Sequence, residues 1–436
     1  MPAKEFKFSQ WGRLIILLLA APHFSNAIAK DFKDFFPTEY PEIEGKGITS
    51  GSTTDDEGDL KDDLKKLGHE LKSSVGYFAK RRTSTCIGAP CKIQVFPLAY
   101  TSRLSGFWGG VRTSIIDITS NDPYRLKLSG MFVRSDSREW LSFATIDIPK
   151  VPFIFTEARI KARTDYSFST EFQYYGTGGE WRENLREERA RYSLNQKDLY
   201  ATIIFPLSGR TEPIQFGLLA AYSIENFKTD NFRNRDDTLL FEEKPEGYRG
   251  GISQSYSVGF IVDSRDDEII PRKGQMFEIS FQHGYDKNNT HNRLTLVDRR
   301  YYSRRKWTLA HRLTLDGFFG APPFWRLRSV AGTDPVLDLN GSGLLIGVRK
   351  GRYHDSFKAL ESLEPRVRLK AFRFMGQLGE GTFVPLAATV GQFGPQFAWS
   401  LYSGLSVWWN RSLQLQVYYA RAMDRNSLNL LFEHEF

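Results

Sequence analysis

The last nine residues, LNLLFEHEF at positions 428–436, are the most informative part of the sequence. Side chains two residues apart share one face of a β-strand, so this stretch predicts a strand with one apolar and aromatic face. A strand also needs neighbours, because its backbone N–H and C=O groups must find partners. The residues that recur at every second position are Leu428, Leu430, Phe432, His434 and Phe436.

The same period-two alternation continues through the whole region from residue 92 to residue 436. In one run, apolar residues at 277, 279 and 281 alternate with polar residues at 278, 280 and 282. Helical periodicity is absent from this region, so the sequence predicts an all-β fold with strands of about ten residues. Further alternating runs lie at 124–132, 214–222, 255–262 and 412–419.

Alternation alone fits both a soluble β-sandwich and a transmembrane antiparallel β-barrel. The region of about 345 residues is longer than an ordinary sandwich, and a closed barrel leaves no strand edge in lipid. The composition is polar on average, with a mean hydropathy of −0.41, yet 14% of residues are aromatic. A polar average and a high aromatic content occur together if the residues of each strand face lipid and water in turn. We therefore predict a transmembrane barrel over residues 92–436.

Residues 1–29 have the features of a signal peptide. Lys4, Lys7 and Arg13 precede an apolar run at 14–21, and Ala27-Ile28-Ala29 provides a cleavage site after Ala29. The apolar run is too short for a membrane anchor, the alternative reading. Cleavage would lower the net charge from +8 to +6, because three basic residues and one acidic residue are lost. This mild excess does not indicate nucleic acid, and it suits anionic lipid or lipopolysaccharide.

Residues 30–91 differ from the rest and are predicted to form a periplasmic linker. A helix is expected over about 59–79, where Leu60, Leu64, Leu67, Leu71, Val75 and Phe78 form one apolar stripe. Such a helix could flank the periplasmic mouth of the barrel or recruit a partner. Cys86 and Cys91 are predicted to form a disulfide in an oxidising periplasm. No second pair of Cys or His residues nearby supports a metal site.

One hairpin contains a motif that goes beyond alternation. Asp263, Arg265 and Asp266 are followed by Pro271 and Gly274 in the spacing D-x-R-D-x4-P-x-x-G. Proline and glycine permit a tight turn, and the charged residues can pair across strands. The carboxylates could instead serve a calcium site or an acid/base pair, but the arginine between them favours an ion-pair network. The motif resembles the barrel domain of the BamA/TamA family of outer-membrane proteins, also called bacterial surface antigens.

Other segments are similar to the same family. The element at Gly347, Arg349, Gly351, Arg352, Tyr353 and Asp355 resembles the one that follows the long sixth extracellular loop. The family's Arg-Gly-aromatic tip is altered here to Ile346-Gly347-Val348, so Arg349 or Arg352 would supply the inward salt bridge, to Asp263 or Glu364. Glu364-Pro365-Arg366 resembles an E-x-R strand, and Glu364 and Arg366 are candidates for an ion pair in the lumen.

The resemblance implies a barrel of sixteen strands without POTRA domains, in the outer membrane of a Gram-negative-type bacterium. The C-terminal residues Leu430, Phe432 and Phe436 resemble the sorting signal that the barrel assembly machinery reads. The expected partners are therefore this machinery, outer-membrane lipid and lipopolysaccharide.

Two functions remain open at this point. The barrel could assist insertion or export of a client protein or lipid at the seam between its first and last strands, where Pro97 cannot donate to the ladder. Alternatively, it could be a structural or pore-forming barrel that passes small solutes. An enzyme is not expected, because none of the seven histidines lies in a nucleophile motif. The sequence predicts no cofactor, metal or catalytic residue.

Overall fold

The computed structural model describes residues 82–432 with short gaps. The gaps lie at 87–88, 103–105, 118–123, 154–155, 178–184, 186, 209–212, 233–236, 269, 288, 332–339, 342–343, 350, 375–376, 410–412 and 424. The predicted signal peptide, the helix at about 59–79 and Phe436 lie outside the described residues.

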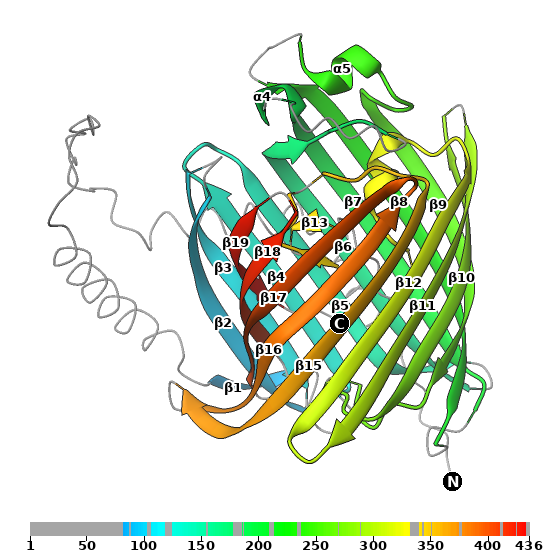
Figure 1. Cartoon of the computed structure of the whole chain (residues 1–436). Coiled ribbons are helices and arrows are strands. Elements are labelled where there is room, and N and C mark those ends of the chain that lie inside the picture. Colours follow the sequence, from blue (N-terminus) through cyan, green and yellow to red (C-terminus); the bar gives the residue numbers. More distant parts are fainter. Residues whose placement is uncertain are drawn as a thin grey trace, which may run out of the picture. The chain divides into compact units, whose positions relative to one another are not determined.

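The described chain forms one large antiparallel sheet in which each strand pairs with the next along the sequence (Figure 1). The short strand β1 (Arg82–Cys86) pairs with β2, and sixteen further strands make up the barrel wall, which confirms the predicted fold class and strand number. These strands are β2 (Ala89–Ser102), β3 (Gly106–Asp117), β4 (Leu126–Ser135), β5 (Trp140–Phe153), β6 (Thr156–Gln173), β7 (Arg191–Pro206), β8 (Gln215–Asn231), β9 (Gly250–Asp263), β10 (Gly274–Asp286), β11 (Thr290–Arg304), β12 (Trp307–Gly320), β15 (Phe357–Phe374), β16 (Gln377–Phe393), β17 (Gln396–Trp409), β18 (Leu413–Ala422) and β19 (Asn426–Phe432).

The strands begin earlier than the sequence predicted, at Arg82 instead of residue 92. The segment that contains Cys86 and Cys91 was expected to be a loop, but β1 and β2 pair there as a hairpin. Thr83 and Thr85 are β-branched residues, which favour a strand. The backbone register places Cys91 opposite Ser84 and Cys86 opposite Ala89. The disulfide stays a prediction.

The two faces of the sheet differ in polarity, as the alternation predicted. On β10, Glu278 and Ser280 are buried on the inner face, whereas Ile279 and Phe281 are exposed on the outer face. The pattern repeats on the other strands, and the exposed outer residues include Leu218, Tyr256, Val258, Leu294, Leu309, Leu363, Leu386, Leu405, Val417 and Tyr419. A soluble protein buries such side chains, so this wall is built to place its outer face in an apolar medium.

The connections at the two ends of the barrel differ in length. One end, here called the turn end, has the β9–β10 connection at 264–273 and the β11–β12 connection at 305–306. The other, the loop end, has the long connections 174–190, 232–249 and 321–356. These contain α4 (Glu187–Ala190), α5 (Leu239–Glu243), η2 (Phe324–Arg328) and the two-residue strands β13 (Asn340–Gly341) and β14 (Leu345–Ile346), which pair in parallel. Figure 1 shows α4 and α5 together at the top. None of the described helices is long and apolar enough to cross a membrane.

Apolar residues also fill part of the interior at the loop end. One cluster joins η2 and α5 to the inner faces of β7 and β8, and a second joins the 344–353 segment to the inner faces of β15–β18. Alternation did not predict this, because it shows which residues share a face and not what covers that face. The two clusters contain Tyr174, Tyr192, Leu194, Phe227, Leu239, Leu240, Phe324 and Trp325, and Val330, Leu344, Leu345, Val348, Tyr353, Leu360, Phe393, Ala398 and Ala422.

Candidate functional site

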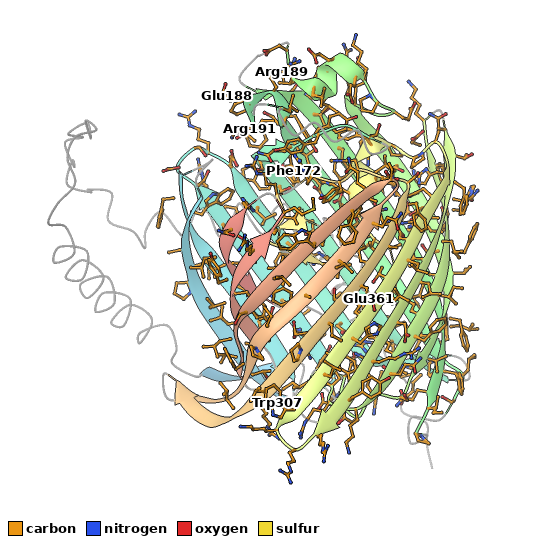
Figure 2. All side chains as sticks on the ribbon, viewed as in Figure 1. Phe172, Glu188, Arg189, Arg191, Trp307 and Glu361 are labelled. Atoms are coloured by element: carbon orange, nitrogen blue, oxygen red, sulfur yellow. The ribbon has the colours of Figure 1, made fainter. Side chains whose placement is uncertain are left out.

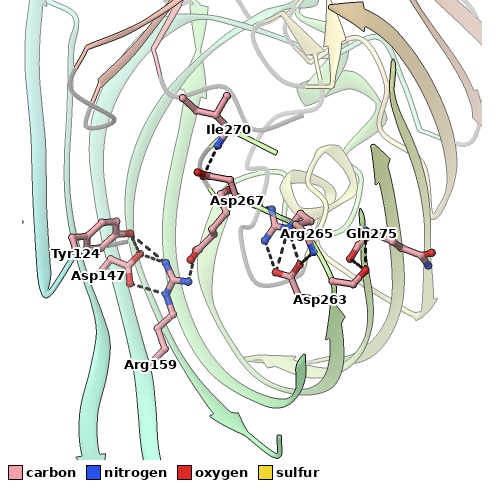
Figure 3. Close-up of polar contacts among 10 residues, drawn as sticks. Tyr124, Asp147, Arg159, Asp263, Arg265, Asp267, Ile270 and Gln275 are labelled. Carbon is pink, nitrogen blue, oxygen red and sulfur yellow. Dashed lines mark hydrogen bonds and ion pairs between the residues drawn. The ribbon is translucent and has the colours of Figure 1, made fainter. Parts of the chain in front are cut away.

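The motif residues Asp263 and Arg265 form an ion pair at the turn end of the barrel (Figure 3). The Arg265 guanidinium donates from Nη2 to Asp263 Oδ2 at 2.7 Å and from Nε to Oδ1 at 2.9 Å. The backbone N–H of Arg265 also donates to Oδ1 at 3.0 Å. Burial alone would lower the pKa of Arg265, but the hydrogen bonds and charge of Asp263 outweigh burial and raise it. The pair therefore stays ionised and fixes the chain as it leaves β9.

Asp266 makes a different kind of contact, because its carboxylate binds backbone N–H groups and not a side chain. Its Oδ1 accepts from the N–H groups of Arg272 and Lys273, at 2.8 and 3.0 Å. Gly274 closes the turn with φ of +95°, and a Cβ there would lie 2.1 Å from the carbonyl oxygen of Ser264. Pro271 is buried within the same turn. These contacts hold the motif as a turn between β9 and β10.

The turn also reaches a second strand pair across the barrel through Glu268, a residue that the motif leaves undefined. Glu268 pairs with Arg159 of β6, and Arg159 donates to both oxygens of Asp147 on β5, at 2.9 and 2.6 Å. Tyr124 donates its hydroxyl to Asp147 at 2.6 Å (Figure 3). Burial and the negative charge of Asp147 raise the pKa of Tyr124. Sequence reasoning missed this group, since Arg159 and Glu268 are 109 residues apart in the chain.

The loop-six-like element folds inward and lies buried inside the barrel. We call residues 344–355 the plug segment, because Leu345, Ile346 and Val348 have at most 1% of their surface exposed. Ile346 accepts a hydrogen bond at its carbonyl from the hydroxyl of Ser400, on the inner face of β17. The Tyr353 ring stacks on Phe393 of β16, with ring centres 4.3 Å apart and 6° between planes.

Two glycines let the plug segment approach opposite walls. Gly347 has φ of +93°, a Cβ there would lie 2.9 Å from Ala420 of β18, and Arg425 donates to its carbonyl at 3.0 Å. Gly351 has φ of +67°, and a Cβ there would lie 1.9 Å from the carbonyl oxygen of Gln173, at the end of β6. The segment therefore spans the lumen between β6 and the β16–β18 wall.

The two arginines of the plug segment make contacts other than the predicted salt bridge. Arg349 donates to the Tyr175 hydroxyl at 3.3 Å, and the Arg352 guanidinium lies 4.2 Å from the centre of the Tyr175 ring. Glu364 instead accepts from Arg366 at 2.5 Å and from Tyr402 at 2.7 Å, while Asp263 pairs with Arg265. The acidic residues are satisfied by their own neighbours, so the arginines bind the aromatic loop after β6.

His354 and Asp355 complete the plug segment. The His354 ring contacts the rings of Tyr174 and Phe324, with centres 5.4 and 5.8 Å away. Burial, with the nearby positive charges of Arg328 and Lys358, lowers the pKa of His354 to about 3. The histidine is therefore neutral at physiological pH. Asp355 accepts from the backbone N–H of Phe357, at 3.0 Å, where β15 begins.

Buried arginines of η2 lie beneath the loop end, and sequence reasoning missed them. Arg326 pairs with Glu225 of β8 at 3.2 Å, and Arg328 donates to Gln196 of β7 at 3.2 Å. Both have only 2% of their surface exposed. The two arginines lie in the stretch FWRLR, where apolar residues flank them. The composition of this stretch is that of an ordinary loop, so nothing in the sequence marked the arginines as buried.

Two residues of the predicted sorting signal lie in the last strand. Leu430 and Phe432 belong to β19 and pair in register with Val417 and Leu415, respectively. Within the described part of the chain, no group of three or more His, Cys, Asp and Glu could hold a metal ion.

The fold and this interior define a β-barrel of the outer-membrane type, with an apolar outer face, a polar inner face and an internal plug. No family model and no curated protein matches the chain. Among solved structures, it is similar to BamA from Haemophilus ducreyi lacking POTRA domains 1–3, with 13% identity and a TM-score of 0.45, over 85% of this chain and 77% of that one. It is also similar to CdiB from Escherichia coli, with 10% identity and a TM-score of 0.46, over 81% of this chain and 65% of that one. CdiB from Acinetobacter baumannii is similar as well, with 10% identity and a TM-score of 0.45, over 78% of this chain and 58% of that one.

Proposed function

We propose that the protein is an outer-membrane barrel that acts on a client protein or lipid at the side of its wall, with its lumen closed to solutes. The observation that carries this proposal is the plug segment. Its apolar residues pack against the inner faces of β15–β18 and its glycines contact opposite walls, so the resting lumen is occupied by the chain itself.

The seam between β2 and β19 is the proposed working edge. β19 is seven residues long, against fourteen for β17, and Pro97 of β2 cannot donate to a ladder. Leu428 of β19 is 75% exposed. A strand edge with few ladder bonds opens at low cost, and an open edge can template a client strand by β-augmentation.

Cross-linking the seam tests this function. Cysteine pairs at positions 96–101 of β2 and 426–432 of β19 would be introduced in a chain that carries Cys86→Ser and Cys91→Ser. We expect the cross-linked chain to lower the levels of other outer-membrane proteins or lipids. The control is a pair at Leu218 and Phe260, which face each other in the β8–β9 register. Unchanged outer-membrane composition after complete cross-linking at the seam would contradict the proposal.

A gated pore is the second candidate, favoured by the polar and charged residues on the inner face of the barrel. Asp316 on β12 pairs there with Arg293 at 2.7 Å and with Lys358 at 2.6 Å. Planar-bilayer conductance separates the two functions. We expect no conductance from the intact chain, and steady conductance by that chain would favour the pore.

A further inference from the structure

The hairpin between β11 and β12 concentrates positive charge at the turn end of the barrel. Arg304, Arg305 and Lys306 follow one another around its tip, and all three are exposed. Within the part of the chain that the structure describes, none of the three side chains forms an ion pair. The hairpin therefore carries charge that its own side-chain contacts do not neutralise.

The neighbouring β9–β10 turn adds two further cations at the same place. Arg272 donates from Nη2 to the carbonyl of Arg305 at 3.1 Å, and the carbonyl of Arg272 accepts from the hydroxyl of Ser303 at 2.7 Å. Lys273 follows in the chain and is exposed. These contacts hold the two turns side by side. We call the five cations at positions 272, 273, 304, 305 and 306 the basic rim.

The carboxylates of the β9–β10 turn offset only part of this charge. Asp266 and Asp267 accept from backbone N–H groups of their own turn, and Glu268 pairs with Arg159 of β6. With Asp266 and Asp267 counted as negative, five cations against two carboxylates leave an excess of three positive charges. A partner that fits the basic rim is therefore an anion.

The outer side of the hairpin changes from apolar to aromatic to cationic toward the tip. In the β11–β12 register Leu309 lies opposite Tyr302, and Trp307 lies opposite Arg304. Leu309, Tyr302 and Trp307 are 38%, 58% and 46% exposed, and Figure 2 shows Trp307 near the lower end of the wall. Exposed aromatic side chains mark the membrane interfaces of a barrel, so the basic rim lies at the level of the lipid headgroups.

We propose that the basic rim is a binding site for an anionic phospholipid, whose headgroup contacts the cations of the two turns and whose acyl chains lie along Leu309 and Tyr302. The inference rests on the membrane location of the proposed function and not on the seam. Short turns face the periplasm in barrels of this type, so the lipid belongs to the periplasmic leaflet.

The order of side chains along the hairpin favours a lipid over an acidic protein. A phospholipid presents an anionic head above apolar chains, and the hairpin presents cations beyond the exposed rings of Trp307 and Tyr302. Arginine and lysine can keep their stems in the interface while their charged ends reach a phosphate, and arginine binds phosphate through two parallel N–H donors. A zwitterionic lipid adds a cation of its own, so the excess positive charge favours a lipid with net negative charge.

Quenching by brominated lipids measures this preference. A fluorescent label on Leu309→Cys, in the full chain carrying Cys86→Ser and Cys91→Ser, would lie beside the proposed site. Liposomes would contain phosphatidylglycerol and phosphatidylcholine, with one or the other brominated. The comparison label is on Leu218→Cys of β8, also near the turn end, 46% exposed and three strands away. We expect phosphatidylglycerol to bind at least about fivefold more tightly than phosphatidylcholine beside position 309, and about equally beside position 218.

A charge variant separates the basic rim from the fold of the hairpin. Arg305 has φ of +57°, a conformation that asparagine adopts readily, so Arg305→Asn removes one charge without straining the turn. The preference for phosphatidylglycerol beside position 309 should fall about fivefold. Lys244→Asn is the matched control, because Lys244 has φ of +50° and is exposed at the loop end. It should leave the preference unchanged.

The quenching itself shows whether the barrel is in the bilayer. No quenching by either brominated lipid at both labels would contradict the proposed membrane function. Quenching without a preference at position 309 would overturn only the lipid site, and would leave an acidic protein as the partner of the basic rim. An equal preference at both labels, or a preference that Arg305→Asn does not change, would overturn the lipid site as well.

Discussion

The β9–β10 turn and the plug segment are both irregular connections, but different contacts hold them. In the turn, Asp263 binds Arg265 two residues away, and Asp266 binds backbone N–H groups six and seven residues away. In the plug segment, Arg349 binds Tyr175, which is 174 residues away in the chain. The motif residues of the turn are held by local contacts, although Glu268 of the same turn also pairs with Arg159 of β6, whereas the plug is held by tertiary contacts. The turn should therefore tolerate changes in the lumen, whereas the plug can leave the lumen without disturbing the turn.

Release of the plug can be measured by the reactivity of a buried thiol. Val348 is 1% exposed, so Val348→Cys in a chain carrying Cys86→Ser and Cys91→Ser should react slowly with a maleimide. Its rate reports how often the plug segment opens, because labelling requires exposure.

Gly351→Val should have the largest effect. The backbone there has φ of +67°, which β-branched residues avoid, and a Cβ would lie 1.9 Å from the carbonyl oxygen of Gln173. We expect labelling at position 348 to rise about a thousandfold, which corresponds to a loss of about 4 kcal/mol. The control is Gly317→Ala, where a Cβ meets no atom within 4 Å. If Gly351→Val labels as slowly as the parent, the plug is not held against β6.

Tyr353→Ala should have the next largest effect. It removes the ring that stacks on Phe393, and loss of a large buried aromatic side chain costs about 3–5 kcal/mol. We expect labelling at position 348 to rise a few hundredfold, about 3 kcal/mol. Tyr353→Phe keeps the ring and should retain most of the protection. Equal rates for the two variants would show that the stack contributes nothing.

The contrast between the two regions also explains what could be predicted from the sequence. Alternation such as Glu278-Ile279-Ser280-Phe281 is a local property, so it predicted the strands, their polarity and the barrel. Pro271 and Gly274 predicted the turn for the same reason. By contrast, Glu268 occupies an undefined position of the motif, and its pairing with Arg159 exists only after the strands curl round.

The plug contacts were hidden for a second physical reason. Arg349 or Arg352 was expected to bind a carboxylate because the family resemblance implies an inward salt bridge from this element. In the folded chain Glu364 already accepts from Arg366 and Tyr402, so the arginines find an aromatic partner in Tyr175. The sequence shows which charges are present, but competition among partners decides the pairs.

Acid should release the plug by a smaller amount than Tyr353→Ala. The pKa of docked His354 is about 3, below the value of about 6.5 for an exposed histidine. Between these values the released segment binds a proton and the docked one does not, so docking is fully stable above pH 6.5 and weakens as pH falls. From pH 7 to pH 5 we expect a loss of about 2 kcal/mol, seen as about thirtyfold faster labelling of Val348→Cys relative to an exposed Glu242→Cys thiol on α5.

The histidine itself is tested by His354→Phe, which keeps a ring between Tyr174 and Phe324. This variant should label at a rate that does not depend on pH after the same normalisation. A pH response that persists in His354→Phe would assign the titration to another group.

Asp266→Ala should have the smallest effect and should leave the plug untouched. It removes the oxygen that accepts from the backbone N–H groups of Arg272 and Lys273, and such a lost cap costs about 1 kcal/mol. Urea unfolding of the barrel in lipid should show this loss, with labelling at position 348 unchanged. Asp266→Asn keeps an acceptor oxygen and should be nearly neutral. If Asp266→Ala speeds labelling as well, the turn and the plug are coupled across the lumen, and the separation between a local turn and a tertiary plug is wrong.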